Sequence, residues 1–356
     1  MFVSKLVKCT NEQGAIAIGG NINQGLFLTP LHLAIIQKNV QLVGELLLLG
    51  ADPNIHTIEY DKIDIRIQTP MSTAVDIGSI EIVGKLIDAG ANINFCQYGE
   101  EFEDPLPLVS AIRNGDNEMF NYLIKRGANI NNEILGIDNY PLIEAVRMSN
   151  KEYVRILVEA GASISPKRRL CSFVEAVRLD DLNMVELLVK LGGGINRKGD
   201  LRRKSALMYA IINKNFDMIN FLLQNGADPN EYKGKKYNIL YYAIKSQLLG
   251  IIDRLLVEGL DINKHTRNIN SLETSLKHGT YEITKRLLDN NAVIDDMENI
   301  KLPDIYTHFE RQYILLFLDY PCDINVKNTE DQTLFDLVKA NNDTELLEII
   351  EQLQNP

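Results

Sequence analysis

The chain has 356 residues, of which 45% are hydrophobic and 24% charged, with a formal net charge of −11 and an isoelectric point near 5.1. This is the composition of a folded protein, and no run of residues reaches the roughly 18 apolar residues that a membrane-spanning helix needs. The acidic balance argues against nucleic-acid binding by the whole surface, and four distant cysteines without a CxxC pair fit a reducing compartment rather than a disulfide framework or a zinc site.

Residues 1–28 precede the first well-formed segment of the chain. They contain a Gly-Gly-Asn-Ile-Asn stretch at 19–23 that matches the ends of later segments, but the helical halves before it are poor. We interpret residues 1–28 as a degenerate N-terminal cap.

A repeated unit begins at residue 29. Its first copy, TPLHLAIIQKNVQLVGELLLLGADPN (29–54), predicts a short helix opening at Thr29-Pro30, a longer helix over 40–49, a left-handed stop at Gly50 and a turn. In each of nine copies, a position near the end of the first helix is followed 20 residues later by the last residue of the tail. We call these nine positions the frame positions: Ala34, Ala74, Ala111, Ala145, Ala176, Ala210, Ala243, Ser275 and Ile305.

This frame predicts a continuous core, because the residue after each frame position is apolar in every copy except the last, where it is Tyr306. The connectors between copies vary in length, as surface loops do. The alternating residues 55–69 predict a two-stranded hairpin, and 97–107 is an acidic connector. We expect these two connectors to form a second contact surface, and residues 332–356 to form a final pair of capping helices.

The TPLHLA opening, the second helix ending in Leu-Leu and the GADPN tail together resemble the ankyrin repeat over residues 29 to about 340. The resemblance implies an all-α, ankyrin-repeat solenoid of stacked antiparallel helix pairs with β-turn or hairpin fingers, with about nine repeats over 29–331. It also implies a structural role for His32, near the turn. The Asn-, Ile- and Lys-rich sequence is similar to ankyrin proteins of intracellular bacteria and large DNA viruses, many of which act on a host.

Catalytic and metal-binding motifs are absent from the sequence. It has no phosphate-binding glycine loop and no HExxH, and its five histidines are scattered. The acidic run at 100–104 lies in a connector, where such a run is usually a solvated charge cluster. We therefore expect no enzyme activity, no cofactor and no metal.

The resemblance places partner binding on the fingers and on the exposed, concave side of the first helices. The wall positions, which lie two residues after each frame position, carry cations in five of the six central copies: Arg113, Arg147, Arg178, Lys245 and Lys277. The fingers after copies four to six are also basic, with Lys167, Arg168, Arg169, Arg202, Arg203, Lys235 and Lys236, and Tyr209 and Tyr241 are nearby candidate anchors. Residues 165–204 contain 10 basic and 5 acidic residues, a net charge of +5, which leaves −16 for the rest of the chain.

These residues predict a non-enzymatic, monomeric, cytoplasmic scaffold that binds an acidic or phosphorylated protein surface through repeats 3–8. A host-directed effector is one form of this function, and the host cytoplasm is then its location. An alternative is binding of anionic lipid headgroups or nucleic acid through the same basic stripe. A second alternative is purely structural: the finger lysines are only solvated, the wall arginines pair with Glu144 or Glu175, and some of the tyrosines complete the core.

Overall fold

The computed structural model of the chain describes residues 29–354, with gaps at 56, 61–64, 96, 99–102, 105, 132–140, 165–170, 197–203, 234–236, 265–269, 295–296 and 298–299. The expected N-terminal cap, residues 1–28, lies outside the described residues. The chain divides into two compact units, unit 1 (Met1–Glu175) and unit 2 (Ala176–Pro356), and the boundary falls inside helix α10 (Ser172–Arg178).

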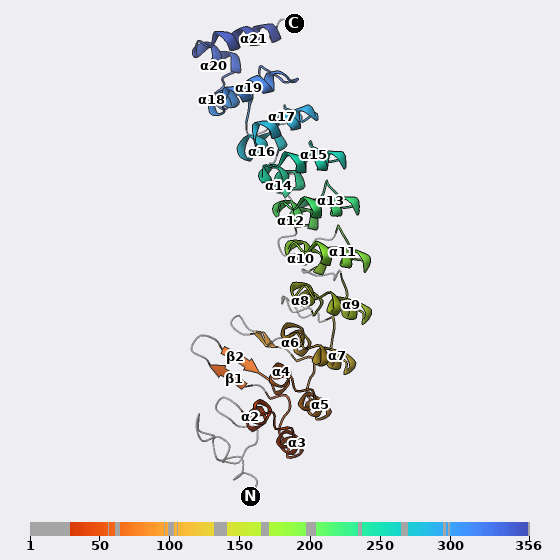
Figure 1. The fold of residues 1–356 in the computed structure, drawn as a ribbon. Helices are drawn as coiled ribbons and strands as arrows, with labels where there is room; N and C mark the ends of the chain where they lie inside the picture. The colour runs from red at the N-terminus through yellow and green to blue at the C-terminus, as the bar shows by residue number, and fades with distance from the viewer. Residues whose placement is uncertain are drawn as a thin grey trace. The chain divides into compact units, whose positions relative to one another are not determined.

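Unit 1 consists of pairs of short helices (Figure 1). The first helices of successive pairs contact one another in chain order, and α3, α5 and α7 do so in a second row. The first helices are α2 (Pro30–Ile36), α4 (Pro70–Asp76), α6 (Pro107–Asn114) and α8 (Pro141–Arg147), and the second helices are α3 (Val40–Leu48), α5 (Ile80–Asp88), α7 (Asn117–Lys125) and α9 (Lys151–Glu159).

Unit 2 repeats this arrangement, with α12, α14 and α16 in contact in chain order. Its first helices after α10 are α12 (Ala206–Ile212), α14 (Ile239–Ser246), α16 (Ser271–His278), α18 (Leu302–His308) and α20 (Leu334–Ala340). Its second helices are α11 (Leu182–Lys190), α13 (Phe216–Gln224), α15 (Leu249–Val257), α17 (Tyr281–Asp289), α19 (Arg311–Leu318) and α21 (Thr344–Gln354). The predicted architecture of stacked helix pairs is therefore confirmed in both units.

Local sequence sets the helix ends in the first copy. Thr29 caps α2, because its hydroxyl accepts from the His32 amide, and Pro30 occupies the first turn, where a missing N–H costs nothing. The buried His32 ring also contacts the Thr29 hydroxyl through Nδ1 at 2.8 Å, which confirms its structural role. After α3, Gly50 has φ +88°, a left-handed conformation that disfavours any side chain, and it stops the helix as predicted.

The described parts of the connectors contain three antiparallel hairpins. Strands β1 (Thr57–Tyr60) and β2 (Ile65–Gln68) pair with Ile58 opposite Ile67, which confirms the hairpin expected over 55–69. Strands β3 (Gln97–Tyr98) and β4 (Glu103–Asp104) form the next hairpin, and β2 contacts β4. In unit 2, β5 (Tyr232–Lys233) pairs with β6 (Tyr237–Asn238).

The core follows the repeat frame. Every frame position from Ala34 to Ile305 is buried, and the apolar residue after it is buried in all copies but the ninth, where Tyr306 is half-buried. Small side chains at the frame positions let neighbouring first helices approach closely, and the apolar column fills the space between successive pairs. The predicted core column is thus confirmed.

Tyr153 departs from the apolar character of the core. It stands at the third position of α9, where the other second helices of unit 1 place Leu42, Ile82 and Met119. Its ring is 2% exposed and stacks on Phe120 with centroids 4.2 Å apart, and its hydroxyl has no hydrogen-bond partner within the described part of the chain. Burial raises the pKa of this phenol.

In six of the described tails, the final asparagine bonds to the next tail. Asn54 Nδ2 donates to the Gly90 carbonyl at 3.0 Å, and Asn54 Oδ1 accepts from the Asn92 amide at 2.7 Å. In unit 1, Asn131 repeats both bonds with the following tail, and Asn94 repeats the second. In unit 2, both bonds recur at Asn196, Asn230 and Asn263. The asparagine is therefore a connector between repeats as well as a turn residue.

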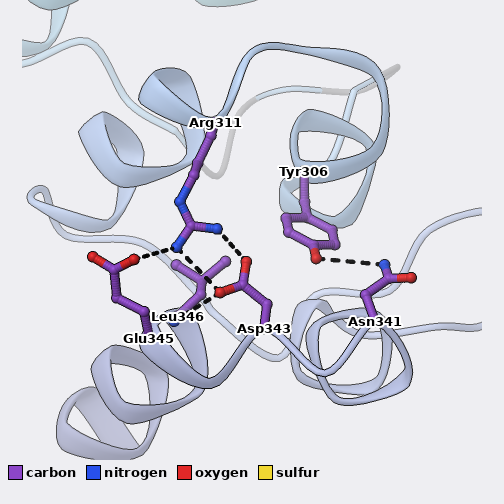
Figure 2. Close-up of polar contacts among 6 residues, drawn as sticks. All are labelled: Tyr306, Arg311, Asn341, Asp343, Glu345 and Leu346. Carbon is purple, nitrogen blue, oxygen red and sulfur yellow. Dashed lines mark hydrogen bonds and ion pairs between the residues drawn. The ribbon is translucent and has the colours of Figure 1, made fainter.

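Polar contacts join the last two helices of unit 2 to the preceding pair (Figure 2). Arg311 of α19 pairs with both Asp343 and Glu345, and Asn341 Nδ2 donates to the Tyr306 hydroxyl at 3.4 Å. Asp343 also caps α21 by accepting from the Leu346 amide at 3.3 Å. Hydrogen bonding to Arg311 lowers the pKa of the Asp343 carboxyl below its usual value.

Candidate functional site

The wall positions lie on the surface of the first helices. They are exposed in every copy except the fourth, where Arg147 is partly buried. The helical period produces this change from the buried column to the surface, because residues one position apart point about 100° away from each other. All five wall cations are described: Arg113 and Arg147 in unit 1, and Arg178, Lys245 and Lys277 in unit 2.

The two wall arginines of unit 1 belong to an ion-pair ladder. Arg113 Nε donates to Glu144 Oε1 at 2.9 Å, and Arg147 Nε donates to Glu175 Oε1 at 2.9 Å. Arg147 Nη1 also lies 3.6 Å from Glu144 Oε2. Each wall arginine therefore reaches the residue just before the frame position of the next copy. The expected alternative, pairing with Glu144 and Glu175, is confirmed for both arginines.

The ladder changes how much positive charge unit 1 presents. Both glutamates are only 6% exposed, whereas the side chains of Arg113 and Arg147 are 39% and 25% exposed. Two carboxylates under two guanidinium groups cancel most of the local field. The ladder therefore fixes the arginine side chains and weakens their attraction for a distant anion.

In unit 2, the wall cation Lys245 lies beside aromatic rings. Tyr209 and Tyr242 occupy the same position as the buried glutamates of unit 1, just before the frame alanine, and both are half-buried. The Lys245 ammonium lies over the Tyr241 ring at 5.9 Å from its centroid, within cation–π range. Arg178 and Lys277 are exposed.

The sequence identified Tyr209 and Tyr241 as candidate anchors. It did not identify Tyr242, Lys204 and His278, which lie against these two rings or against each other in the structure. A comparison of the residues directly before the frame positions could have identified Tyr242. In copies four to seven these residues are Glu144, Glu175, Tyr209 and Tyr242. That column places the ion-pair glutamates in unit 1 and the aromatic residues in unit 2. Lys204 and His278 have no comparable signal, since Lys204 precedes α12 and reaches the Tyr242 ring of α14, and His278 of α16 reaches the Tyr241 ring of α14.

The predicted finger residues Lys167, Arg168, Arg169, Arg202, Arg203, Lys235 and Lys236 lie outside the described residues. The described residues of the finger after copy six form strands β5 and β6, and β6 is followed directly by α14. The basic finger after copy six thus adjoins the helix that carries Tyr241 and Lys245.

The described residues contain no group of three or more His, Cys, Asp or Glu side chains that could hold a metal ion. A cavity of about 240 Å³ in unit 2 is lined by Ile294, Met297, Lys301, Leu302, Asp323 and Val326, which include no serine, cysteine or histidine. In the part of the chain that the structure covers, no helix is both long and apolar enough to cross a bilayer.

Comparison with known proteins identifies the repeat. The model of the family "Ankyrin repeats (3 copies)" matches residues 31–134, 71–168 and 172–233, more than half of the chain. An ankyrin repeat protein of Fowlpox virus (strain NVSL) is 34% identical over 103 residues, which are 29% of this chain and 13% of that protein. This chain therefore matches only a small part of the viral relative.

Two solved structures are similar in fold. The ankyrin repeat domain of Bcl-3, a member of the IkappaB family, has 24% identity and a TM-score of 0.49, and the match covers 65% of this chain and 98% of that domain. The human ASB11 ankyrin repeat domain has 21% identity and a TM-score of 0.48 over the same shares. Ankyrin repeats are generally protein–protein interaction modules and typically non-enzymatic. The matched family model and the confirmed helix-pair frame show that the chain belongs to the ankyrin repeat family.

Proposed function

We propose that the chain is a non-enzymatic scaffold that binds an acidic or phosphorylated surface of a partner protein through the first helices and fingers of repeats 3–8. The observation that carries the proposal is the exposure of the wall cations Arg178, Lys245 and Lys277 in unit 2. They stand on an otherwise acidic chain, so a complementary partner would be steered to this face and mismatched surfaces repelled.

The ion-pair ladder moves the centre of the proposed surface toward unit 2. Arg113 and Arg147 remain partner-contacting residues in the proposal, but their charge is largely offset by Glu144 and Glu175. Lys245 and Lys277 then contribute most of the electrostatic attraction, and Tyr209 and Tyr241 supply anchors beside them.

The remaining features of the proposal concern context. We propose that residues 29–331 form about nine repeats between an N-terminal cap and the C-terminal helices 332–356, that the chain acts as a monomer, and that it works in the cytoplasm. Its limited similarity to a fowlpox virus protein supports a host-directed role, and the host cytoplasm would then be its location.

Affinity capture from a eukaryotic cell lysate tests the proposal. The wall variant combines Arg178→Glu, Lys245→Glu and Lys277→Glu. The control variant combines Lys190→Glu, Lys285→Glu and Lys327→Glu, three exposed lysines of unit 2 outside the first helices. Both variants change the net charge equally, so a difference between them reports the local surface.

We expect the wild type and the control variant to capture the same proteins and the wall variant to lose them. Phosphatase treatment of the lysate distinguishes a phosphorylated partner from an acidic one. Anionic lipid or nucleic acid as the ligand would instead give binding that falls steeply between about 50 and 200 mM salt. Equal capture by both variants would place the binding surface elsewhere.

A further inference from the structure

Aromatic side chains gather on three neighbouring first helices of unit 2. Tyr209 comes from α12, Tyr241 and Tyr242 from α14, and His278 from α16. The Tyr241 ring meets Tyr242 edge-on at a centroid distance of 5.4 Å, and it meets His278 edge-on at 6.2 Å. These contacts hold the rings in fixed orientations, as a binding surface requires. We call this group, with Lys245 and Lys277, the aromatic–basic patch.

Lysine ammonium groups lie over the tyrosine faces of the patch. Lys204 Nζ is 5.2 Å from the centroid of Tyr209 and 5.5 Å from that of Tyr242, and Lys245 Nζ lies over Tyr241. Single-stranded nucleic acid binds by stacking its bases on open aromatic faces. Because a cation already lies over each of these three rings, the geometry disfavours base stacking.

The charge of the patch favours a carboxylate ligand. Lys245 and Lys277 occupy wall positions of adjacent repeats, and both are exposed. The acidic residue of the same helix as Lys277, Glu273, is only 4% exposed, so the outward face of α16 in the patch is cationic. A ligand with two nearby carboxylates would therefore meet two exposed ammonium groups on neighbouring helices.

An apolar contact is available beside these cations. Ile212, the wall residue of the preceding repeat, is 40% exposed. The half-buried rings of Tyr209 and Tyr241 belong to the same and the following first helix. Large exposed aliphatic and aromatic groups next to cations form the kind of surface on which a few residues provide most of the binding energy.

We propose that the aromatic–basic patch binds a short acidic peptide segment of a partner protein, in which carboxylates flank one large aromatic side chain. The carboxylates pair with Lys245 and Lys277, and the aromatic side chain packs against Ile212 and the edge of the Tyr241 ring, whose face Lys245 covers. This inference rests on the proposed function and names the part of the partner that repeats six to eight recognise.

A tryptophan peptide provides a direct probe. The chain contains no tryptophan, so the emission of a seven-residue probe peptide with Trp between two runs of Glu and Asp reports binding without background from the protein. We expect a saturable blue shift on addition of the full chain. A peptide with Ala in place of Trp, used as an unlabelled competitor, should compete more weakly.

Variants locate the binding to the patch. Lys245→Glu with Lys277→Glu should weaken peptide binding by about tenfold or more, and Tyr241→Ala by about tenfold. Tyr241→Phe keeps the ring and should bind close to wild type. The matched control, Lys190→Glu with Lys285→Glu, should also bind like wild type. The exposed lysine variants keep the test decisive if Tyr241→Ala fails to fold by circular dichroism.

Three results would overturn the inference: no saturable peptide binding, equal weakening in the control, or patch-dependent binding of oligothymidylate or phosphatidylserine vesicles that exceeds peptide binding. The outcome is separable from the proposed function. If the peptide fails while the wall variant still loses its captured proteins, only the acidic-segment inference falls. If the wall variant keeps those proteins, the proposed function falls as well.

Discussion

Replacing Arg147 by methionine should destabilise unit 1 by about 2–3 kcal/mol. The arginine donates to Glu175 at 2.9 Å and lies 3.6 Å from Glu144, and both carboxylates are nearly inaccessible to water. A hydrogen bond to a charged group contributes about 1.5–3 kcal/mol, and stranding a buried charge costs about 3–5 kcal/mol. We expect a loss of stability near the low end of these two ranges, because the Arg147 side chain is a quarter exposed and Glu144 still pairs with Arg113 in the variant.

A double variant separates the ion pair from simple loss of packing. Arg147→Met with Glu175→Leu removes both charges and fills the site with apolar groups, and such replacements are often neutral or stabilising. The double variant should therefore recover most of the stability that the single variant loses. That recovery is the signature of a stranded carboxylate.

Urea denaturation followed by far-ultraviolet circular dichroism measures both variants. Arg155→Met is the matched control, because its one ion pair among the described residues is with the exposed Glu152 at 3.7 Å, and such surface pairs contribute about 0.5 kcal/mol or less. The reasoning would be refuted if Arg147→Met cost no more than the control, or if the double variant were less stable than the single one.

Three further predictions follow from the described contacts. Tyr153→Phe removes a buried hydroxyl without a partner in the described chain and should leave stability unchanged or raise it by up to about 1 kcal/mol in urea titration; a clear loss would contradict this. Asn131→Ala removes both bonds to the next tail and should cost about 1–2 kcal/mol in thermal melts, whereas Asn121→Ala, whose side chain donates to the Asn117 carbonyl of its own helix, should cost less. The pKa of Asp343 is lowered in the fold, so its pairing with Arg311 stabilises the fold fully above the unfolded pKa of about 4. This stabilisation is lost as the pH falls through the lower folded pKa, so the stability advantage of wild type over Asp343→Asn should be full at neutral pH and vanish in acid. A stability difference that does not depend on pH would exclude this linkage.

The sequence determined the fold through spacing. A frame residue and a tail residue 20 positions apart, kept through nine copies, specify one helix pair and its turn in each copy. Because each pair buries its apolar column only against its neighbours, that local pattern is enough to predict the stack, the buried frame positions and the exposed wall positions. The hairpin over 55–69 was also predictable from a local pattern, because apolar and polar residues alternate along it with a period of two.

The tertiary structure decided which wall cations are engaged by other side chains of the chain. Arg113 and Glu144 are 31 residues apart in sequence, yet stacking of consecutive helices brings their side chains to 2.9 Å. The same stacking assembles Tyr241, Lys245 and His278 from two helices and links Asn263 to the next tail. The repeat frame determines which face of the helix a residue occupies. The distance between two side chains on neighbouring repeats depends on how the helices pack, and it cannot be derived from the sequence of one repeat.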